Sequence, residues 1–206
     1  MSEISCRRSG MTQSTTDRCC GMTPKPELIQ KAKPAGKCVV RILGPEVFGL
    51  PKREKIKRFD DAFCCDVARL LGKSQMENSR YDKNTGGMVL VGFFLMEEDV
   101  RRILCDRLMR YVVVLMDKKN ALHGFFAVRS ADDSTFDITD FYVDQDLRRK
   151  GYGRKMLNAF LKRLKADRKH RMTKVELSVA LGNDAAMAFY AASGFRETAR
   201  EMSMEL

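Results

Sequence analysis

Segment 136–166 restricts the fold more than any other part of the sequence, because a strand, a glycine turn and a helix follow one another there. The run FDITDFYV at 136–143 has the content of a strand, and apolar residues at helical spacing predict a helix from about residue 154 to residue 166. Between them, Gly151 and Gly153 leave backbone amides accessible, and the first turn of the helix adds unpaired N–H groups and a positive dipole end. The turn is therefore predicted to bind an anion.

The basic side chains around this turn indicate the kind of anion. They fit a pyrophosphate with further phosphate charge, and they are Arg148, Arg149, Lys150, Arg154 and Lys155. The spacing matches neither the Walker A motif nor the dinucleotide-binding pattern G-x-G-x-x-G. A solvated turn between a strand and a helix has a similar composition, so this motif alone leaves both interpretations open.

The rest of the pattern predicts an α+β domain with a mixed, mostly antiparallel sheet flanked by helices. A hairpin of two strands feeds the strand at 136–143 and its crossover helix, which produces such a sheet. Strands are expected at 38–43, 111–116, 121–128, 173–179 and 195–204, and further helices at 56–70 (ended by Gly72), 97–108 and 183–192. Segment 73–87 is expected to be a loop, with a short helix as the alternative, and 88–96 is either a strand or a buried helix.

Length and composition limit the class of protein. The chain has 206 residues, of which 44% are hydrophobic, and this predicts one globular domain over 37–206 after a polar, disordered tail at 1–36. No apolar run approaches the ~20 residues that cross a bilayer, and no signal peptide is recognisable, so we expect no membrane and a cytoplasmic or nuclear protein. The seven cysteines suit a reducing compartment and lack zinc-site spacing, so no metal is expected.

The charge is distributed unevenly along the chain. Residues 1–58 supply +8 of the net +11, and no nucleic-acid-binding motif accompanies them, so direct nucleic-acid binding is not expected. The run KREKIKR at 52–58 is either a solvated helix face or a nuclear-import signal. In contrast, 130–147 holds six aspartates and no Lys or Arg, which indicates a cationic partner.

Two motifs carry a resemblance to a known family. Arg148-x-x-Gly151-x-Gly153 and, about thirty residues later, NDAAMAFYAASGF at 183–195 resemble the acyl-CoA motifs of the GNAT superfamily of N-acetyltransferases. The resemblance covers 111–206, and 52–110 only in element order. It implies acetyl-CoA as co-substrate, with the pyrophosphate on amides of 149–154 and the pantetheine beside Val143. The implied cofactor-binding residues are Val143, Arg148, Arg149, Lys150, Gly151, Tyr152, Gly153, Arg154 and Asn183.

The resemblance also implies catalytic roles. Tyr190 would give a proton to the departing thiolate, although a core aromatic is the alternative interpretation, and the amide of Val143 would hold the carbonyl. Asp137 and Asp140 are candidate bases, and ideal strand alternation places them on opposite faces, so one of them is expected to line the cleft. Phe141 and Tyr142 are expected to bind the substrate.

Among GNAT enzymes the sequence is most similar to the NatD-type protein N-terminal acetyltransferases. This similarity implies acetylation of the α-amine of a protein with a basic tail of the histone type. The chain has no Trp, which that family has at its substrate end, so Phe93 or Phe94 is expected to replace it. The alternatives are a lysine or small-amine acetyltransferase of the same fold and a noncatalytic acyl-CoA-binding module.

Overall fold

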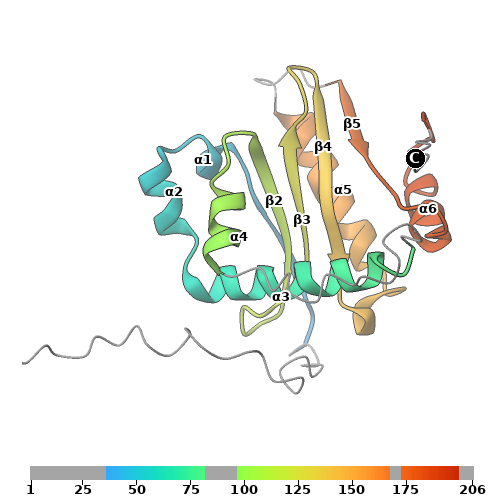
Figure 1. Cartoon of the computed structure of the whole chain (residues 1–206), viewed down its shortest axis with the longest axis horizontal. Coiled ribbons are helices and arrows are strands. Elements are labelled where there is room, and N and C mark those ends of the chain that lie inside the picture. The colour runs from blue at the N-terminus through green and yellow to red at the C-terminus, as the bar shows by residue number, and fades with distance from the viewer. Residues whose placement is uncertain (1–35, 82–96, 168–172, 200–206) are drawn as a thin grey trace, which may run out of the picture. The chain divides into compact units, whose positions relative to one another are not determined.

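A computed structural model describes residues 36–81, 97–167 and 173–199 (Figure 1). These residues form a five-stranded sheet in the order β1-β2-β3-β4-β5. The strands are β1 (Val39–Leu43), β2 (Met109–Met116), β3 (Leu122–Ser130), β4 (Thr135–Val143) and β5 (Lys174–Leu177). Strands β1 to β4 are antiparallel neighbours, and β5 is parallel to β4. The mixed, mostly antiparallel sheet is thus confirmed.

Helices cover both faces of this sheet (Figure 1). They are α1 (Pro45–Phe48), α2 (Lys52–Arg58), α3 (Asp61–Asn78), α4 (Glu97–Leu104), α5 (Tyr152–Ala166) and α6 (Asp184–Ala191), with a 3₁₀ turn η2 (Gln145–Leu147) before α5. Helices α3 and α4 pack on one face, and α5 packs on the other. Because β2 has a covered face on each side, its run YVVVL is buried throughout rather than alternating. None of the described helices is long and apolar enough to cross a membrane.

The predicted helix at 56–70 differs from the structure at both ends. Helix α2 ends at Arg58, and α3 begins after Asp60, whose carboxylate accepts a hydrogen bond from the amide of Phe63 at 2.7 Å. Helix α3 continues through Gly72 to Asn78, so Gly72 is not a stop. A mid-helix glycine costs only ~1 kcal/mol, and the buried Leu71 and Ser74 on either side of it hold this turn against the sheet. The loop prediction is therefore wrong for 73–78.

The strand predicted at 195–204 is absent from 195–199, the part of it that the structure describes. Gly194 has a φ of +94°, and the amide of Phe195 donates to the carbonyl of Tyr190 at 3.0 Å. This is the hydrogen bonding of a helix C-terminus, so Phe195 closes α6 instead of continuing as a strand. The predictions for 1–35 and 82–96, including Phe93, Phe94 and the domain boundary at residue 36, fall largely outside the described residues and stay predictions.

Candidate active site

Strand β4 carries a bulge in the middle of the acidic segment. Ala127 pairs with Thr139 and Phe125 pairs with Tyr142, so Asp140 and Phe141 both lie opposite Phe126. Asp140 adopts a φ of +55°, a left-handed conformation that Asp tolerates better than most residues. The bulge interrupts the strand alternation, and the expectation that Asp137 and Asp140 lie on opposite faces loses its basis.

The two aspartates form an acidic group with Glu176 of β5. In the strand register, Asp137 lies opposite Arg129 of β3 on one side and opposite Glu176 on the other. Burial raises the pKa of Asp137, and the charges of Glu176 and Asp140 raise it further. Asp140 is exposed, but enough protein surrounds its carboxyl group that desolvation raises its pKa, against the opposing effects of Thr139 and Arg129. Both carboxyl groups therefore bind a proton more readily than an ordinary Asp side chain does.

The edge of β4 next to this group is open at one end. Pairing between β4 and β5 ends at Ile138 and Leu177, and no described residue of β5 pairs with β4 beyond that point. The amide of Asp144 donates to the carbonyl of His123 in β3 at 2.8 Å. Since peptide groups along a strand alternate in direction, the carbonyl and the amide of Val143 point away from β3, toward the open side. A strand-like ligand fits this edge.

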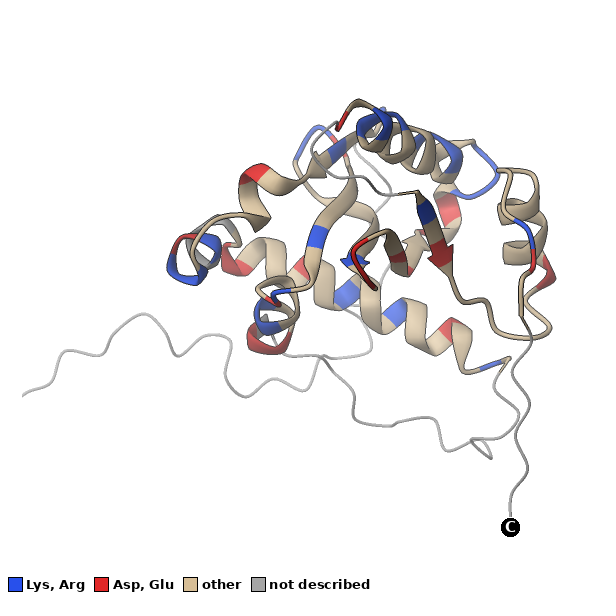
Figure 2. Ribbon diagram, turned by 90° about the horizontal axis from the view of Figure 1, so that it is seen from above, with Lys and Arg blue, Asp and Glu red and all other residues tan. Residues whose placement is uncertain are grey.

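The turn before α5 presents backbone amides at the same end of β4. Arg149 and Gly151 have left-handed φ values of +61° and +79°, and Gly151 caps α5. No described residue accepts a hydrogen bond from the amides of 150–154, and the first helical bond runs from Lys155 to Gly151 at 3.0 Å. Helix α5 has Arg154 and Lys155 near its N-terminus and no acidic residue along its length (Figure 2). Free amides, a helix dipole and positive charge suit a diphosphate.

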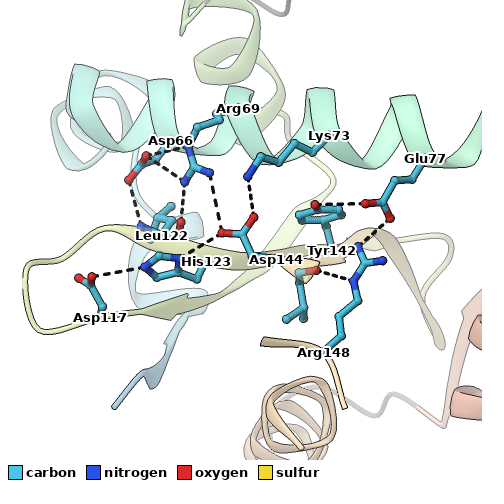
Figure 3. A network of polar contacts seen from close by, with 11 residues as sticks. Asp66, Arg69, Lys73, Glu77, Asp117, Leu122, His123, Tyr142, Asp144 and Arg148 are labelled. Carbon is cyan, nitrogen blue, oxygen red and sulfur yellow. Dashed lines mark hydrogen bonds and ion pairs between the residues drawn. The ribbon is translucent and has the colours of Figure 1, made fainter. Parts of the chain in front are cut away.

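Arg148, the first residue of the turn motif, points elsewhere. Its Nε donates to the carbonyl of Val143 at 2.7 Å, and its Nη2 forms an ion pair with Oε2 of Glu77 at 2.7 Å (Figure 3). Its guanidinium lies 5.0 Å from the centre of the Tyr142 ring, whose hydroxyl donates to Glu77 at 3.4 Å. The side chain expected to bind the cofactor is therefore engaged with the end of β4 and with α3.

The neighbouring aromatic side chains of Phe141 and Tyr142 lie on opposite faces of the sheet. Tyr142 is buried under α3, whereas Phe141 stacks on Phe126 with ring centres 4.7 Å apart and contacts the ring of Tyr190 at 6.0 Å. Burial raises the pKa of Tyr190, and no described residue hydrogen-bonds with its hydroxyl group. Tyr190 therefore keeps its proton at neutral pH beside the bulge of β4.

The remaining cofactor-binding candidates have mainly local roles. The side chain of Asn183 accepts a hydrogen bond from the amide of Ala186 at 3.1 Å, and it therefore caps α6. The Cβ position of Gly153 lies 3.6 Å from Phe189 and 3.8 Å from Phe141, which are ordinary contact distances, so packing against these rings does not by itself require a glycine there. Tyr152 lies under the ammonium group of Lys155, which is 5.0 Å from the ring centre.

A buried polar network next to the site was not predicted (Figure 3). His123 lies between Asp117, 3.3 Å from Nε2, and Asp144, 3.1 Å from Nδ1. Hydrogen bonding to Asp144 raises the pKa of His123 although burial opposes it. Burial favours a raised pKa for Asp144, but the hydrogen bonds to His123 and Lys73 outweigh it and lower that pKa. The negative charge of Asp144 is thus compensated by Lys73 and His123 within the protein, so Asp144 is not a binding site for a cationic partner.

Comparisons with known proteins identify the family. A family model described as the acetyltransferase (GNAT) family matches residues 83–195, more than half of the chain. The chain belongs to the GNAT family. It is therefore an acyltransferase that uses acetyl-CoA, and the amides of the turn together with the open edge of β4 fit that co-substrate. A search of curated proteins found no match.

Solved structures agree with this fold. A mutant of the BH1408 protein from Bacillus halodurans is 20% identical, with 82% of this chain and 99% of that chain covered and a TM-score of 0.57. The aminoglycoside acetyltransferase meta-AAC0020 from an uncultured soil metagenomic sample, solved with sisomicin, is 15% identical, with coverages of 82% and 96% and a TM-score of 0.50. A second soil aminoglycoside acetyltransferase, HMB0005, is 17% identical, with coverages of 83% and 99% and a TM-score of 0.50. At these identities the likeness shows the fold alone.

Replacing Gly151 by Ala tests the turn. An L residue at φ +79° is strained by ~1–2 kcal/mol, and relief of that strain turns the amides away from the ligand. We expect the affinity for CoA, measured by titration calorimetry, to fall about tenfold or more, since ~1.4 kcal/mol is a factor of ten. Gly72→Ala in α3 is the control, because nothing lies within 4 Å of its Cβ position. Unchanged affinity in Gly151→Ala would contradict the assignment of this turn.

The His123 network predicts a pH dependence of stability. Because the pKa of His123 is raised on folding, its stabilisation is complete below the unfolded pKa of about 6.5 and is lost as pH rises through the folded value. His123→Gln should lower the free energy of unfolding by ~1.5–3 kcal/mol at pH 6, the usual contribution of hydrogen bonds to charged groups. Urea titrations from pH 6 to pH 9 should show this difference shrinking, and a constant difference would disprove a charged His123.

Proposed function

We propose that this GNAT enzyme acetylates the α-amine of a protein N-terminus that is followed by basic residues, as in a histone-type tail. The observation that supports the proposal is the bulge of β4 at Asp140, which lies on the stretch of this strand beyond Ile138 that β5 no longer pairs with. The carboxyl groups of Asp137 and Asp140 support a cationic acceptor at that place, whereas Glu176 beside them is ion-paired with Lys174. The proposed compartment is the cytoplasm or the nucleus.

The residues of the site have distinct chemical tasks. Acetyl-CoA, when bound, supplies an activated acetyl thioester. The carboxylate of Asp140 would accept a proton from the ammonium group, which leaves the neutral amine that attacks, and the outward amide of Val143 would donate to the thioester carbonyl oxygen. Tyr190 holds a proton on its hydroxyl oxygen for the departing sulfur. As the C–N bond forms and the C–S bond breaks, Tyr190 would protonate the sulfur to give a neutral thiol, and the excess proton on the new amide nitrogen would return to the Tyr190 oxygen.

The choice of an α-amine follows from the strength of the base. Neutralising a lysine with a pKa of about 10.4 at pH 7 costs ~4.6 kcal/mol, whereas an α-amine near 7.8 costs ~1.1 kcal/mol. One aspartate whose pKa is raised by desolvation is still a weak base, and a weak base is enough to neutralise an α-amine but not a lysine. Two of the structural neighbours act on aminoglycosides, and the acidic group fits any polycation, so small polyamines are the second candidate acceptors.

A panel of amines tests the acceptor class. Thiol release from acetyl-CoA is measured with basic peptides that carry a free α-amine, with the same peptides N-blocked but containing Lys, and with polyamines or an aminoglycoside. We expect turnover with the free α-amine peptides alone, and faster turnover when basic residues follow the N-terminus. Turnover only with blocked Lys peptides or only with small polyamines would overturn the proposed acceptor.

Asp140→Asn tests the base. General-base catalysis contributes about 10²–10⁴-fold, so kcat at pH 7 should fall ~100-fold and recover partly at pH 9, where the α-amine is already neutral. In the parent enzyme, activity should decline as pH falls through the raised pKa of Asp140, and the variant should lack this decline. Asp133→Asn, an exposed residue of the same acidic segment, is the matched control. A parent-like pH profile in Asp140→Asn would remove Asp140 from the mechanism.

A further inference from the structure

The peptide group between Val143 and Asp144 is held from both sides. Its N–H, from Asp144, donates to the carbonyl of His123 at 2.8 Å, and its carbonyl, from Val143, accepts from Nε of Arg148 at 2.7 Å. In an extended strand the amide of Val143 lies on the same side as the carbonyl of Val143. That amide, to which the proposed function gives the thioester oxygen, belongs to the preceding peptide group, so the bond to Arg148 restricts its orientation through the backbone angles of Val143.

Arg148 is in turn fixed by α3. Oε2 of Glu77 pairs with its Nη2 at 2.7 Å, and the ring of Tyr142 lies under the guanidinium. The other carboxylate oxygen of Glu77 accepts from the hydroxyl of Tyr142 at 3.4 Å and from Nε2 of Gln145 at 2.9 Å. Glu77 therefore contacts β4, η2 and Arg148 together, and Figure 3 shows its contacts with Tyr142 and Arg148, which hold the guanidinium in one position.

The same helix holds the other end of the peptide. One turn before Glu77, the ammonium group of Lys73 lies 2.7 Å from Oδ1 of Asp144, and Arg69 lies 3.9 Å from Oδ2 of Asp144. Asp144 is also hydrogen-bonded to His123. Helix α3 therefore acts on both residues of the peptide, through Lys73 on the side chain of Asp144 and through Glu77 and Arg148 on the carbonyl of Val143.

We propose that Glu77 and Arg148 are positioning residues, which orient the amide of Val143 toward the thioester oxygen, and that Arg148 is not a phosphate ligand. The inference rests on the proposed transfer reaction at this site. A donor to a developing oxyanion accelerates the reaction only when it is already oriented. Loss of the Glu77–Arg148 pair therefore slows the chemical step more than it weakens binding of acetyl-CoA.

Arg148→Lys is the decisive variant, because it keeps a positive charge for any phosphate but removes the planar Nε donor. We expect kcat to fall at least about tenfold while the KM for acetyl-CoA and the calorimetric Kd for CoA stay within about twofold. Glu77→Gln should reduce kcat in the same way, and the double variant should be no slower than Arg148→Lys alone, since both act through one contact. An unchanged kcat, or a loss confined to KM and Kd, would overturn the proposal.

A structural readout without acetyl-CoA accompanies the kinetics. In the ligand-free protein, hydrogen exchange of the Asp144 amide should be faster in Arg148→Lys and in Glu77→Gln than in the parent, because the peptide is held from one side only. The matched control is the Glu46–Arg163 pair, 3.2 Å apart and half exposed, where Glu46→Gln and Arg163→Lys should change neither exchange nor kcat. Equal exchange in all variants would refute the positioning role.

These measurements separate the two proposals. A parent enzyme that transfers acetyl groups, with variants that retain its kcat, would refute the positioning role and leave the proposed function standing. A parent protein that binds acetyl-CoA but acetylates no amine would refute both.

Discussion

The separation of β4 from β5 beyond Ile138 is the constraint on which the site depends. Up to Ile138 both edges of β4 are paired, and beyond it the edge next to β5 has no described strand partner. The bulge at Asp140 and the amides before α5 lie along the same stretch of chain. The proposed base Asp140, the amide of Val143 that would hold the thioester carbonyl and the turn that would bind the diphosphate thus lie along one unpaired edge, which suits one elongated ligand.

The polar contacts of α3 explain how the backbone of this open edge keeps one conformation. An unpaired strand end has no ladder hydrogen bonds on one side, so its peptide groups need other partners. Nε of Arg148 is such a partner for the carbonyl of Val143. The amide of Asp144, in the same peptide group, donates to the carbonyl of His123 on the side of β3, and the side chains of His123 and Asp144 are hydrogen-bonded to each other. This arrangement removes the carboxylates of Asp117 and Asp144 from water in whole or in part, and their hydrogen bonds to His123 and the ion pair of Asp144 with Lys73 compensate for that. The network therefore combines local stability with a fixed geometry at the site.

Sequence reasoning succeeded where the determinants are close together in the chain. The strand, the glycine turn and the helix of 136–166 are adjacent, so their order predicted these elements and indicated the family. The pairing of Glu77 with Arg148 spans 71 residues and depends on α3 passing through Gly72, which no local rule predicts. The four-residue spacing of Arg69, Lys73 and Glu77 was the available signal. The bulge at Asp140 had a signal in the sequence, because the period of two that is apolar at Phe136 and Ile138 fails at Asp140 and resumes one residue late at Phe141.

The central claim is that the open end of β4 and the turn before α5 bind one molecule of acetyl-CoA. Amide shift mapping by NMR during a titration with CoA tests it most directly. We expect saturable chemical-shift changes that are largest at the amides of Val143 and of 150–154, with no shift changes on the β1–β2 side of the sheet. No saturable change, or changes confined to the far side of the sheet, would contradict it.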